Sequence, residues 1–559
     1  MTNDLVIRNG TVVDGTGTKR VHADVAVKDG LITEVGKVTG SSKKTIDASD
    51  LIVAPGFVDP HTHYDAQICW DDITSPSSWH GVTTVMMGNC GVGLAPCKPE
   101  SREVAAWDLV NVEAIPFDVL KAGVTWDWES FPEYMEAAQT RKPGLNQGFL
   151  CPLTPFRHYV MGEESMERSA TEKETAAVTN LLREAMDNGA FGFSTTCTPQ
   201  HVGYEGKPLA CRMASHEELR SYSNVLKTLG RGAIEIALTS DVSRIGPSER
   251  ELLELLLESS GRPVTWLALL NRDDDPEAVQ KTLRDNADLI ERGSIPQSTC
   301  RPFIIQIDLS KPFIFANMDC WHPVLNKPAD EQIKILSDGK FRSAFKEALK
   351  RPLIFSSRWE VMTILECKSS ELNHYIGRNV AEIARERNTD PVDTFLDLAI
   401  EDHLQMQFNY ELFNSDEERI PELITDPRTM IGLSDGGAHV DALCDAGYAT
   451  YLLGTWVRDN EVISLERAVQ RITTEPASLF GITDRGRIAP GLAADFAIFD
   501  LSTVGSDKTG EMRFDLPGGG RRLVVPSRGV EYTIVNGETL FEQGQDTGSR
   551  QGQVLRSGQ

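Results

Sequence analysis

The sequence of 559 residues lacks long apolar runs and is short of positive charge. No uninterrupted apolar stretch approaches the ~20 residues that a membrane-spanning helix needs, so we expect no membrane segment. Its 56 Lys and Arg residues are outnumbered by 82 Asp and Glu residues, which leaves a formal net charge of -26. So acidic a surface disfavours binding to nucleic acids and to anionic membranes. The expected partner is a small molecule, and assembly into a homo-oligomer is left open.

The marks of export are also missing. The first residues, MTNDLVIRNG, contain no basic start followed by an apolar core, so no signal peptide is expected. The ten cysteines show no paired spacing, which is typical of reduced thiols and not of a disulfide framework. The sequence therefore predicts a cytoplasmic protein.

What the sequence does contain is β-rich segments at its two ends. Residues 5–54 alternate apolar and polar positions between Asn-Gly and Asp-Gly turns, as hairpin strands do. Residues 493–501 and 530–544 repeat this style. The two ends could pair into one sheet or form two independent β-domains.

Between the ends, strand-like runs alternate with helical or irregular segments, among them helix candidates at 171–188, 216–229 and 247–260. Eight such units predict an α/β fold with a parallel sheet closed into a (β/α)8 TIM-type barrel. The eight strand-like runs are 51–59, 82–90, 146–151, 189–195, 232–239, 263–270, 298–306 and 429–435.

Two intervals are too long to be plain connections. Residues 91–145 follow the second run, and residues 307–428 follow the seventh and include the amphipathic stretch 376–403. Insertions at the carboxyl ends of barrel strands usually wall or cover the active site. We expect both insertions to do so here.

The most informative stretch is 51–63, LIVAPGFVDPHTH, in which an apolar run ends in two histidines. In a strand, side chains at positions i and i+2 point to the same face, so His61 and His63 should project together. Two converging imidazoles form half of a site for zinc or a related metal. The alternative is a pair of polar residues in a strand-to-loop turn.

Asp435 ends the apolar run MIGLSDGGAH and thus the predicted eighth strand. A barrel places its first and eighth strands side by side, so Asp435 should face His61 and His63. The alternative is an N-cap or turn aspartate before two glycines.

The stretch PGFVDPHTH, residues 55–63, resembles the opening strand of the amidohydrolase superfamily, written PGFxDxHxH. Within that superfamily the chain is similar to the N-acyl-D-amino-acid deacylase (D-aminoacylase) branch over nearly its whole length. GRIAPGLAAD, residues 486–495, looks like the GxIxxGxxAD turn of the family. The resemblance implies a barrel at 58–484 and a small β-sandwich built from 1–57 and 485–559.

The resemblance also implies roles for single residues. Asp435, in Ser-Asp-Gly-Gly, stands where the superfamily has an aspartate that binds the metal and acts as general base. Cys90, in MMGNCGVGLAP, matches a GNCGxxxAP stretch whose cysteine is a metal ligand in D-aminoacylases. A thiolate binds zinc well. A small buried thiol in a Gly-rich turn is the other reading of Cys90.

The chain departs from this branch in two places. D-aminoacylases have metal-binding histidines at the ends of the fifth and sixth strands, whereas GAIEIALTSD and PVTWLALLNR contain none. We therefore expect one divalent ion and not two, with zinc the expected metal, on His61, His63 and Asp435, with Cys90 as a fourth ligand. Two alternatives stay open: a histidine from elsewhere substitutes, or the metal is lost and the protein only binds a ligand. The residue at the fifth-strand position is Leu238 or Thr239, and the residue at the sixth-strand position is Ala268 or Leu269. The histidines that could substitute are His439, His201, His322 and His374.

Two residues are candidates for substrate binding. His439 lies just past Asp435 and could instead be a hydrogen-bonding residue of a Gly-rich turn. Arg358 ends the run LIFSSR and could clamp a substrate carboxylate, or pair with one of the many acids of the chain.

The resulting hypothesis is a metal-dependent hydrolase that cleaves the C–N (amide) bond of a small molecule such as an N-acyl amino acid. The metal would activate water, and Asp435 would be the general base. A cyclic amide or a lactone would suit the same scaffold, as would deamination or decarboxylation. The hypothesis from another class is a degenerate, non-catalytic binding protein on an amidohydrolase fold.

Overall fold

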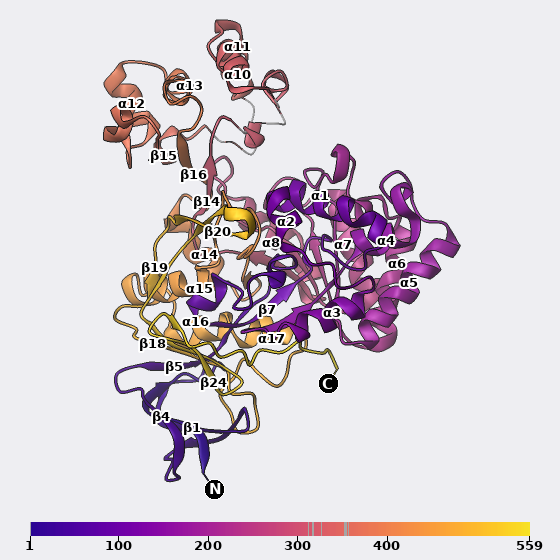
Figure 1. Cartoon of the computed structure of the whole chain (residues 1–559), viewed down its shortest axis with the longest axis vertical. Helices are drawn as coiled ribbons and strands as arrows, with labels where there is room; N and C mark the ends of the chain where they lie inside the picture. Colours follow the sequence, from indigo (N-terminus) through magenta and orange to yellow (C-terminus); the bar gives the residue numbers. More distant parts are fainter. Residues whose placement is uncertain are drawn as a thin grey trace. The chain divides into compact units, whose positions relative to one another are not determined.

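A computed structural model describes the chain except for residues 1, 311, 316–317, 326, 351–354, 356 and 559. The chain divides into two compact units (Figure 1). The first unit consists of Met1–Leu270, Val279–Arg301 and Pro421–Gln559, and the second of Asn271–Ala278 and Pro302–Ile420. No helix in the described part of the chain is long and apolar enough to cross a membrane.

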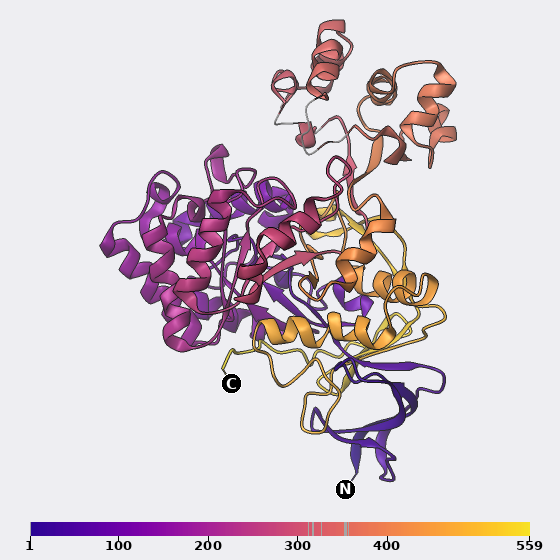
Figure 2. The ribbon, with the colours of Figure 1, turned by 180° about the vertical axis from the view of Figure 1, so that it is seen from behind.

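The two ends of the chain form one sheet, as predicted. The N-terminal and C-terminal segments meet where β18 (Phe496–Phe499) pairs antiparallel with β5 (Ile52–Pro55). In Figure 2 the indigo strands of the N-terminal segment lie beside yellow strands of the C-terminal segment. The strand order is β25-β24-β23-β18-β5-β1-β2-β3, with β4 paired to β1. The remaining bounds are β1 Asn3–Val12, β2 Val21–Lys28, β3 Leu31–Gly36, β4 Ser42–Asp47, β23 Val530–Val535, β24 Glu538–Glu542 and β25 Gln545–Asp546.

Burial on one face explains this pairing. Ile7 and Val53 from the N-terminal strands share a core with Phe496, Ile498 and Ile534 from the C-terminal strands. Alternation gives each strand one apolar face, and the apolar faces from both ends of the chain are buried in this one core.

The first unit also contains a barrel of eight parallel strand positions. Its two sheets run β6-β7-β8 and β9-β10-β11-β12-β13-β17, and one residue separates β8 from β9. A parallel bridge between Thr62 and Gly436 joins the first strand to the eighth and closes the ring. The bounds are β6 Phe57–Asp59, β7 Val82–Met87, β8 Asn146–Phe149, β9 Cys151–Pro152, β10 Gly192–Thr196, β11 Ala233–Ala237, β12 Val264–Leu267, β13 Ser294–Ser298 and β17 Met430–Ile431.

The predicted position of the seventh strand, 298–306, was wrong. The barrel strand is β13, Ser294–Ser298, which lies between β12 and β17. The apolar run FIIQI instead forms β14 (Phe303–Ile307) in an antiparallel sheet of the second unit. Pro296 and the polar residues of β13 make a weak strand signal, whereas FIIQI makes a strong one.

The helices of the barrel follow their sequence signals. Three predicted helices are present as α5 (Glu172–Asp187), α6 (His216–Leu229) and α7 (Pro247–Ser260). Thr171 and Ser215 cap the first two, each accepting a hydrogen bond from the backbone of the glutamate three residues later. α6 packs on both α5 and α7, and Figure 1 shows the three together at the outside of the barrel.

The insertion 91–145 is helical and belongs to the first unit. It forms α1 (Arg102–Glu113), α2 (Phe117–Gly123) and α3 (Phe131–Thr140). Helix α1 reaches the metal-ligand group described below.

The second unit combines α10 to α13 with the sheet β14-β16-β15. The amphipathic stretch 376–403 is not one helix, because Asn388 at a φ of 53° and the turn before Pro391 divide it. That this unit covers the barrel mouth stays a prediction. The bounds are α10 Ala329–Leu336, α11 Gly339–Ala348, α12 Val380–Arg387, α13 Pro391–Glu401, β15 Met362–Glu366 and β16 Gln407–Phe413.

Candidate metal centre

His61 and His63 follow β6 and point to the same side, as the strand period predicts. Their Nε2 atoms are 3.2 Å apart, and both side chains are buried. Between them Thr62 turns toward the neighbouring strand, where its hydroxyl donates to the Met86 carbonyl at 2.7 Å. Because side chains alternate along the strand, the two imidazoles point one way and Thr62, which fixes the strand end, points the other.

Cys90 completes a group of three metal-binding side chains. Its Sγ lies 3.5 Å from His61 Nε2, and the ligand atoms of His61, His63 and Cys90 all lie within 4.8 Å of one another. Cys90 has a φ of 55°, and Gly91 beside it has a φ of 73°. A Cβ on Gly91 would lie 2.9 Å from Thr195 Cα, so only glycine lets this turn approach β10.

Asp435 stands against the two histidines across the barrel closure. Its Oδ1 lies 3.3 Å from His61 Nε2 and 3.7 Å from His63 Nε2. Ser434 beside it donates to Asp59 at 2.8 Å, and this bond ties the eighth strand to the first. The structure therefore brings together all four residues that the sequence predicted as ligands.

Buried acids that the sequence analysis did not single out surround this group. Glu113 at the end of α1 places Oε1 3.3 Å from His63 Nδ1. Glu235 on β11, the fifth strand, accepts the Cys90 N–H at 2.6 Å. The sequence could have indicated Glu235, since a charged residue inside the apolar run AIEIA is unusual and is expected to face the barrel interior. No sequence pattern indicated Glu113, because only the path of the chain after β7 brings it to His63.

Burial and neighbouring charges perturb the acidity of these groups strongly. Burial raises the pKa of Glu235 to about 8 and that of Glu113 to about 7. Burial also lowers the pKa of His61 to about 4. For His63 and Asp435 burial is outweighed: Glu113 and Asp435 raise the pKa of His63 to about 9, and His63 and His61 hold that of Asp435 below its ordinary range.

The donor set fits a divalent cation. Imidazole nitrogen, thiolate sulfur and carboxylate oxygen are the ligands that zinc takes in proteins. The Oε1 atoms of Glu113 and Glu235 are buried and accept no hydrogen bond from the described residues. Burying several acidic groups close together is unfavourable, and a cation offsets that cost.

The fifth and sixth strands end in residues that are not metal ligands. Leu238 and Leu269 are buried apolar side chains, and the Thr239 hydroxyl bonds to the Leu267 carbonyl at 3.3 Å. Among the histidines that could substitute is His201, whose pKa is lowered to about 3 by burial and by the nearby charges of His439 and His63. His201 is outside the three-residue group, and His322 and His374 lie in the second unit.

The two predicted substrate-binding residues differ in their surroundings. His439 lies in the loop after Asp435, where burial lowers the pKa of its ring. Its backbone N–H donates to the backbone carbonyl of Glu113 at 2.5 Å. Arg358 belongs to the second unit and pairs with Asp273 at 2.5 Å and Glu360 at 3.0 Å. Its guanidinium thus has the acidic partners that the sequence offered as the alternative to a substrate clamp.

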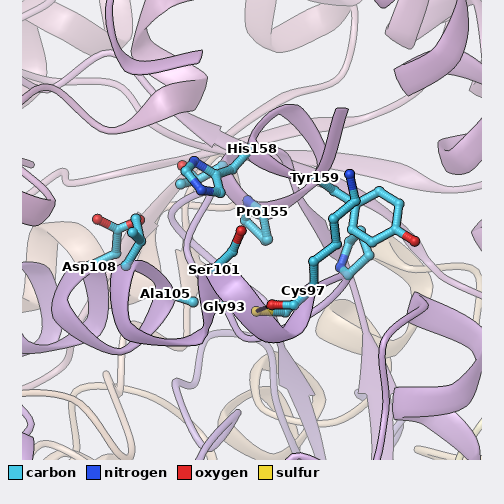
Figure 3. A pocket seen from close by; sticks show the side chains of 12 residues that line it. Gly93, Cys97, Ser101, Ala105, Asp108, Pro155, His158 and Tyr159 are labelled. Atoms are coloured by element: carbon cyan, nitrogen blue, oxygen red, sulfur yellow. Dashed lines mark hydrogen bonds between the residues drawn. The ribbon is translucent and has the colours of Figure 1, made fainter. Parts of the chain in front are cut away.

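A separate cavity lies between α1, α4 (Leu153–Met161) and the segment from Gly93 to Lys98 (Figure 3). Its volume of about 10 Å³ holds roughly one water molecule. None of the predicted site residues lines it, so we do not regard it as a substrate site. Asp108 on α1 and His158 on α4 are among the residues that line it in Figure 3.

Asp108 allows a prediction of pH dependence. Its Oδ1 accepts the Tyr204 N–H at 2.9 Å, and burial raises its pKa from 3.8 to about 7. The folded protein therefore keeps a proton that the unfolded chain releases, so stability from this group is fully present below about pH 4 and lost as the pH rises through 7. Asp108→Asn removes this dependence. From pH 5 to 7.5 the free energy of unfolding of the wild type should fall relative to that of the variant by up to about 1.4 kcal/mol per pH unit, and its thermal midpoint should fall with it.

Asp118→Asn, a change at an exposed site on α2, is the control and should leave the pH profile of the midpoint as it is. If the thermal midpoints of the wild type and of Asp108→Asn differed by the same amount at every pH in this range, a raised pKa at Asp108 would be contradicted.

A closed parallel barrel whose first, second and eighth strands supply a His-x-His, a cysteine and an aspartate defines the class of this protein. The chain belongs to the amidohydrolase family, whose model matches residues 44–343 and 365–541. It is 27% identical to a D-aminoacylase of Alcaligenes xylosoxydans xylosoxydans, over 99% of this chain and 97% of the relative. It is 28% identical to an N-acyl-D-aspartate deacylase of the same organism, over 99% and 95%.

A crystal structure of D-aminoacylase matches the fold with a TM-score of 0.67 at 25% identity, covering 99% of this chain and 100% of that one. An uncharacterized protein of Mycobacterium tuberculosis is 28% identical over 100% of this chain and 95% of the relative. The resemblance to the D-aminoacylase branch is thereby confirmed.

Proposed function

We propose that this protein is a metal-dependent hydrolase that cleaves the C–N bond of a small amide, such as an N-acyl amino acid. The observation that carries the proposal is the convergence of His61, His63 and Cys90 on one point, with Asp435 against both histidines. The relatives named D-aminoacylase and N-acyl-D-aspartate deacylase support an acylated amino acid as the substrate class.

The proposed mechanism assigns a role to each residue. His61, His63 and Cys90 would hold a divalent ion, zinc by their chemistry, and Asp435 lies beside the two histidines. When bound, such an ion polarises a carbonyl and lowers the pKa of water. Asp435 accepts the proton of the attacking water and passes it to the departing nitrogen, which then leaves as an amine. Its depressed pKa keeps the carboxylate ionised and ready for this step.

We propose one ion in preference to two. The residues that follow the strands that would complete a second position include Leu238 and Leu269, which cannot bind a metal. A related structure, 25% identical, is described as having a binuclear centre with one-metal activation and second-metal attenuation. A single ion is therefore compatible with catalysis in this branch.

The experiment is metal analysis followed by a substrate screen. Purified protein should contain about one equivalent of a divalent metal, lose activity on chelation and regain it with Zn²⁺. The screen covers N-acyl amino acids of both hands, cyclic amides and lactones. We expect turnover of N-acyl amino acids with release of a free amine, measured with an amine-reactive reagent.

A lactone or cyclic amide as the better substrate would keep the metal chemistry and change the substrate class. Substoichiometric metal, with no turnover of any compound after addition of Zn²⁺, would favour the non-catalytic binding protein and contradict the proposal.

A further inference from the structure

We propose that Glu113 is a positioning residue for His63: its carboxylate holds the ring so that Nε2 faces the metal position. The inference rests on the proposed function, since it gives His63 a metal to bind. Glu113 lies in the insertion after the second strand, outside the His-x-His, the cysteine and the aspartate that define the site.

The two nitrogens of the His63 ring have different neighbours. Nε2 faces the ligand group, 3.2 Å from His61 Nε2 and 3.7 Å from Asp435 Oδ1. Nδ1 faces Glu113, whose Oε1 lies 3.3 Å away. A carboxylate on one side of the ring favours the tautomer with its proton on Nδ1 and leaves the Nε2 lone pair free. Nδ1 of His61 and Nδ1 of His63 both make no hydrogen bond to the described residues, and of the two it is His63 Nδ1 that has a carboxylate oxygen 3.3 Å away.

The position of Glu113 is unfavourable unless it has a partner. It is the last residue of α1, and Ala114 follows with a φ of 51°, which ends the helix. A carboxylate at a helix carboxyl end opposes the helix dipole, and only 3% of the residue is exposed to solvent. The interaction with His63 offsets both costs, and this Oε1 accepts no hydrogen bond from the described residues.

Glu113 also joins two loops of the site through one residue. Its side chain faces the end of the first strand. Its backbone carbonyl accepts a hydrogen bond from the backbone N–H of His439, in the loop after the eighth strand. Helix α1 is itself fixed, since Asn111 donates to the Gly203 carbonyl at 2.7 Å. A side chain on an anchored helix can hold a ring in one orientation, which a residue of a free loop could not do.

The test compares Glu113→Gln and Glu113→Ala with Glu103→Ala, a change at an exposed position in the first turn of the same helix. Zn²⁺ affinity is measured by competition with a chromophoric chelator, and ligand geometry by the absorption spectrum of the Co²⁺-loaded protein. Glu113→Ala should weaken Zn²⁺ binding about 10–100-fold, the usual cost of losing such a partner, and alter the Co²⁺ spectrum.

Glu113→Gln keeps an acceptor oxygen without the charge, so its Zn²⁺ affinity should fall between those of Glu113→Ala and the wild type. Glu103→Ala should match the wild type. Wild-type Zn²⁺ affinity and Co²⁺ spectrum in Glu113→Gln and Glu113→Ala together would overturn the inference. If Glu113→Ala does not fold, Glu113→Gln, which has nearly the same volume, decides alone.

A separate measurement distinguishes this inference from the proposed function. Above about pH 9, where the His63 ring is neutral, its ¹⁵N chemical shifts report its tautomer in the metal-free protein, whether or not the protein hydrolyses an amide. The Nδ1–H form should dominate in the wild type and lose that dominance in Glu113→Ala, which has no acceptor at this position. An unchanged tautomer would refute the role of Glu113, whereas a wild type that binds no metal would refute the proposed function.

Discussion

Replacing His61 and His63 together by alanine should remove the metal and abolish hydrolysis. The change deletes two of the three side chains whose ligand atoms lie within 4.8 Å of one another. Cys90 and Asp435 alone do not make the three-ligand site that a catalytic zinc requires. The loss of Zn²⁺ affinity should exceed the 10–100-fold expected for Glu113→Ala, because ligands are deleted and not their partner.

The matched control is the double variant of His22 and His216, two exposed histidines of the same unit. It should keep metal and turnover. Circular dichroism of the His61 and His63 variant should resemble that of the wild type, since the barrel core lies in the surrounding apolar side chains. Full metal retention in this double variant would rule the site out.

Asp435→Asn should act on turnover much more than on binding. Asparagine keeps the shape and one oxygen donor, but it cannot accept the proton of the attacking water. The loss in kcat should be roughly 10²–10⁴-fold, as expected when a general base is removed. KM and metal content should change much less, because the group of His61, His63 and Cys90 is complete without Asp435.

Asp441→Asn is the control in the same loop, where Asp441 faces Arg521 at 3.4 Å. It should leave kcat near the wild-type value. A wild-type kcat in Asp435→Asn, measured on the substrate found in the screen, would mean that another group takes the proton.

Local sequence rules were enough to predict much of the fold and of the candidate metal centre. The period of a strand placed His61 and His63 on one face, and their Nε2 atoms lie 3.2 Å apart. Closure of a parallel barrel placed Asp435 beside them, and the bridge between Thr62 and Gly436 is that closure. The capping residues Thr171 and Ser215 marked helix starts. Each signal depends on a few neighbouring residues, or on the one topology that alternating strands and helices allow.

Only the tertiary structure decided the rest. Pro296 lies in a barrel strand because β12 and β17 flank it, although its sequence is a poor strand former. Glu113 reaches His63 from 50 residues away in sequence, through a helix whose path no local pattern specifies. Glu235 is held in the interior by the N–H of Cys90, a bond between the fifth and second strands. The sequence by itself determined which side chains could bind a metal, because ligand chemistry and strand period are local. Which acids surround those ligands was decided by long-range packing, because a buried carboxyl is retained only where the folded chain supplies a partner for it.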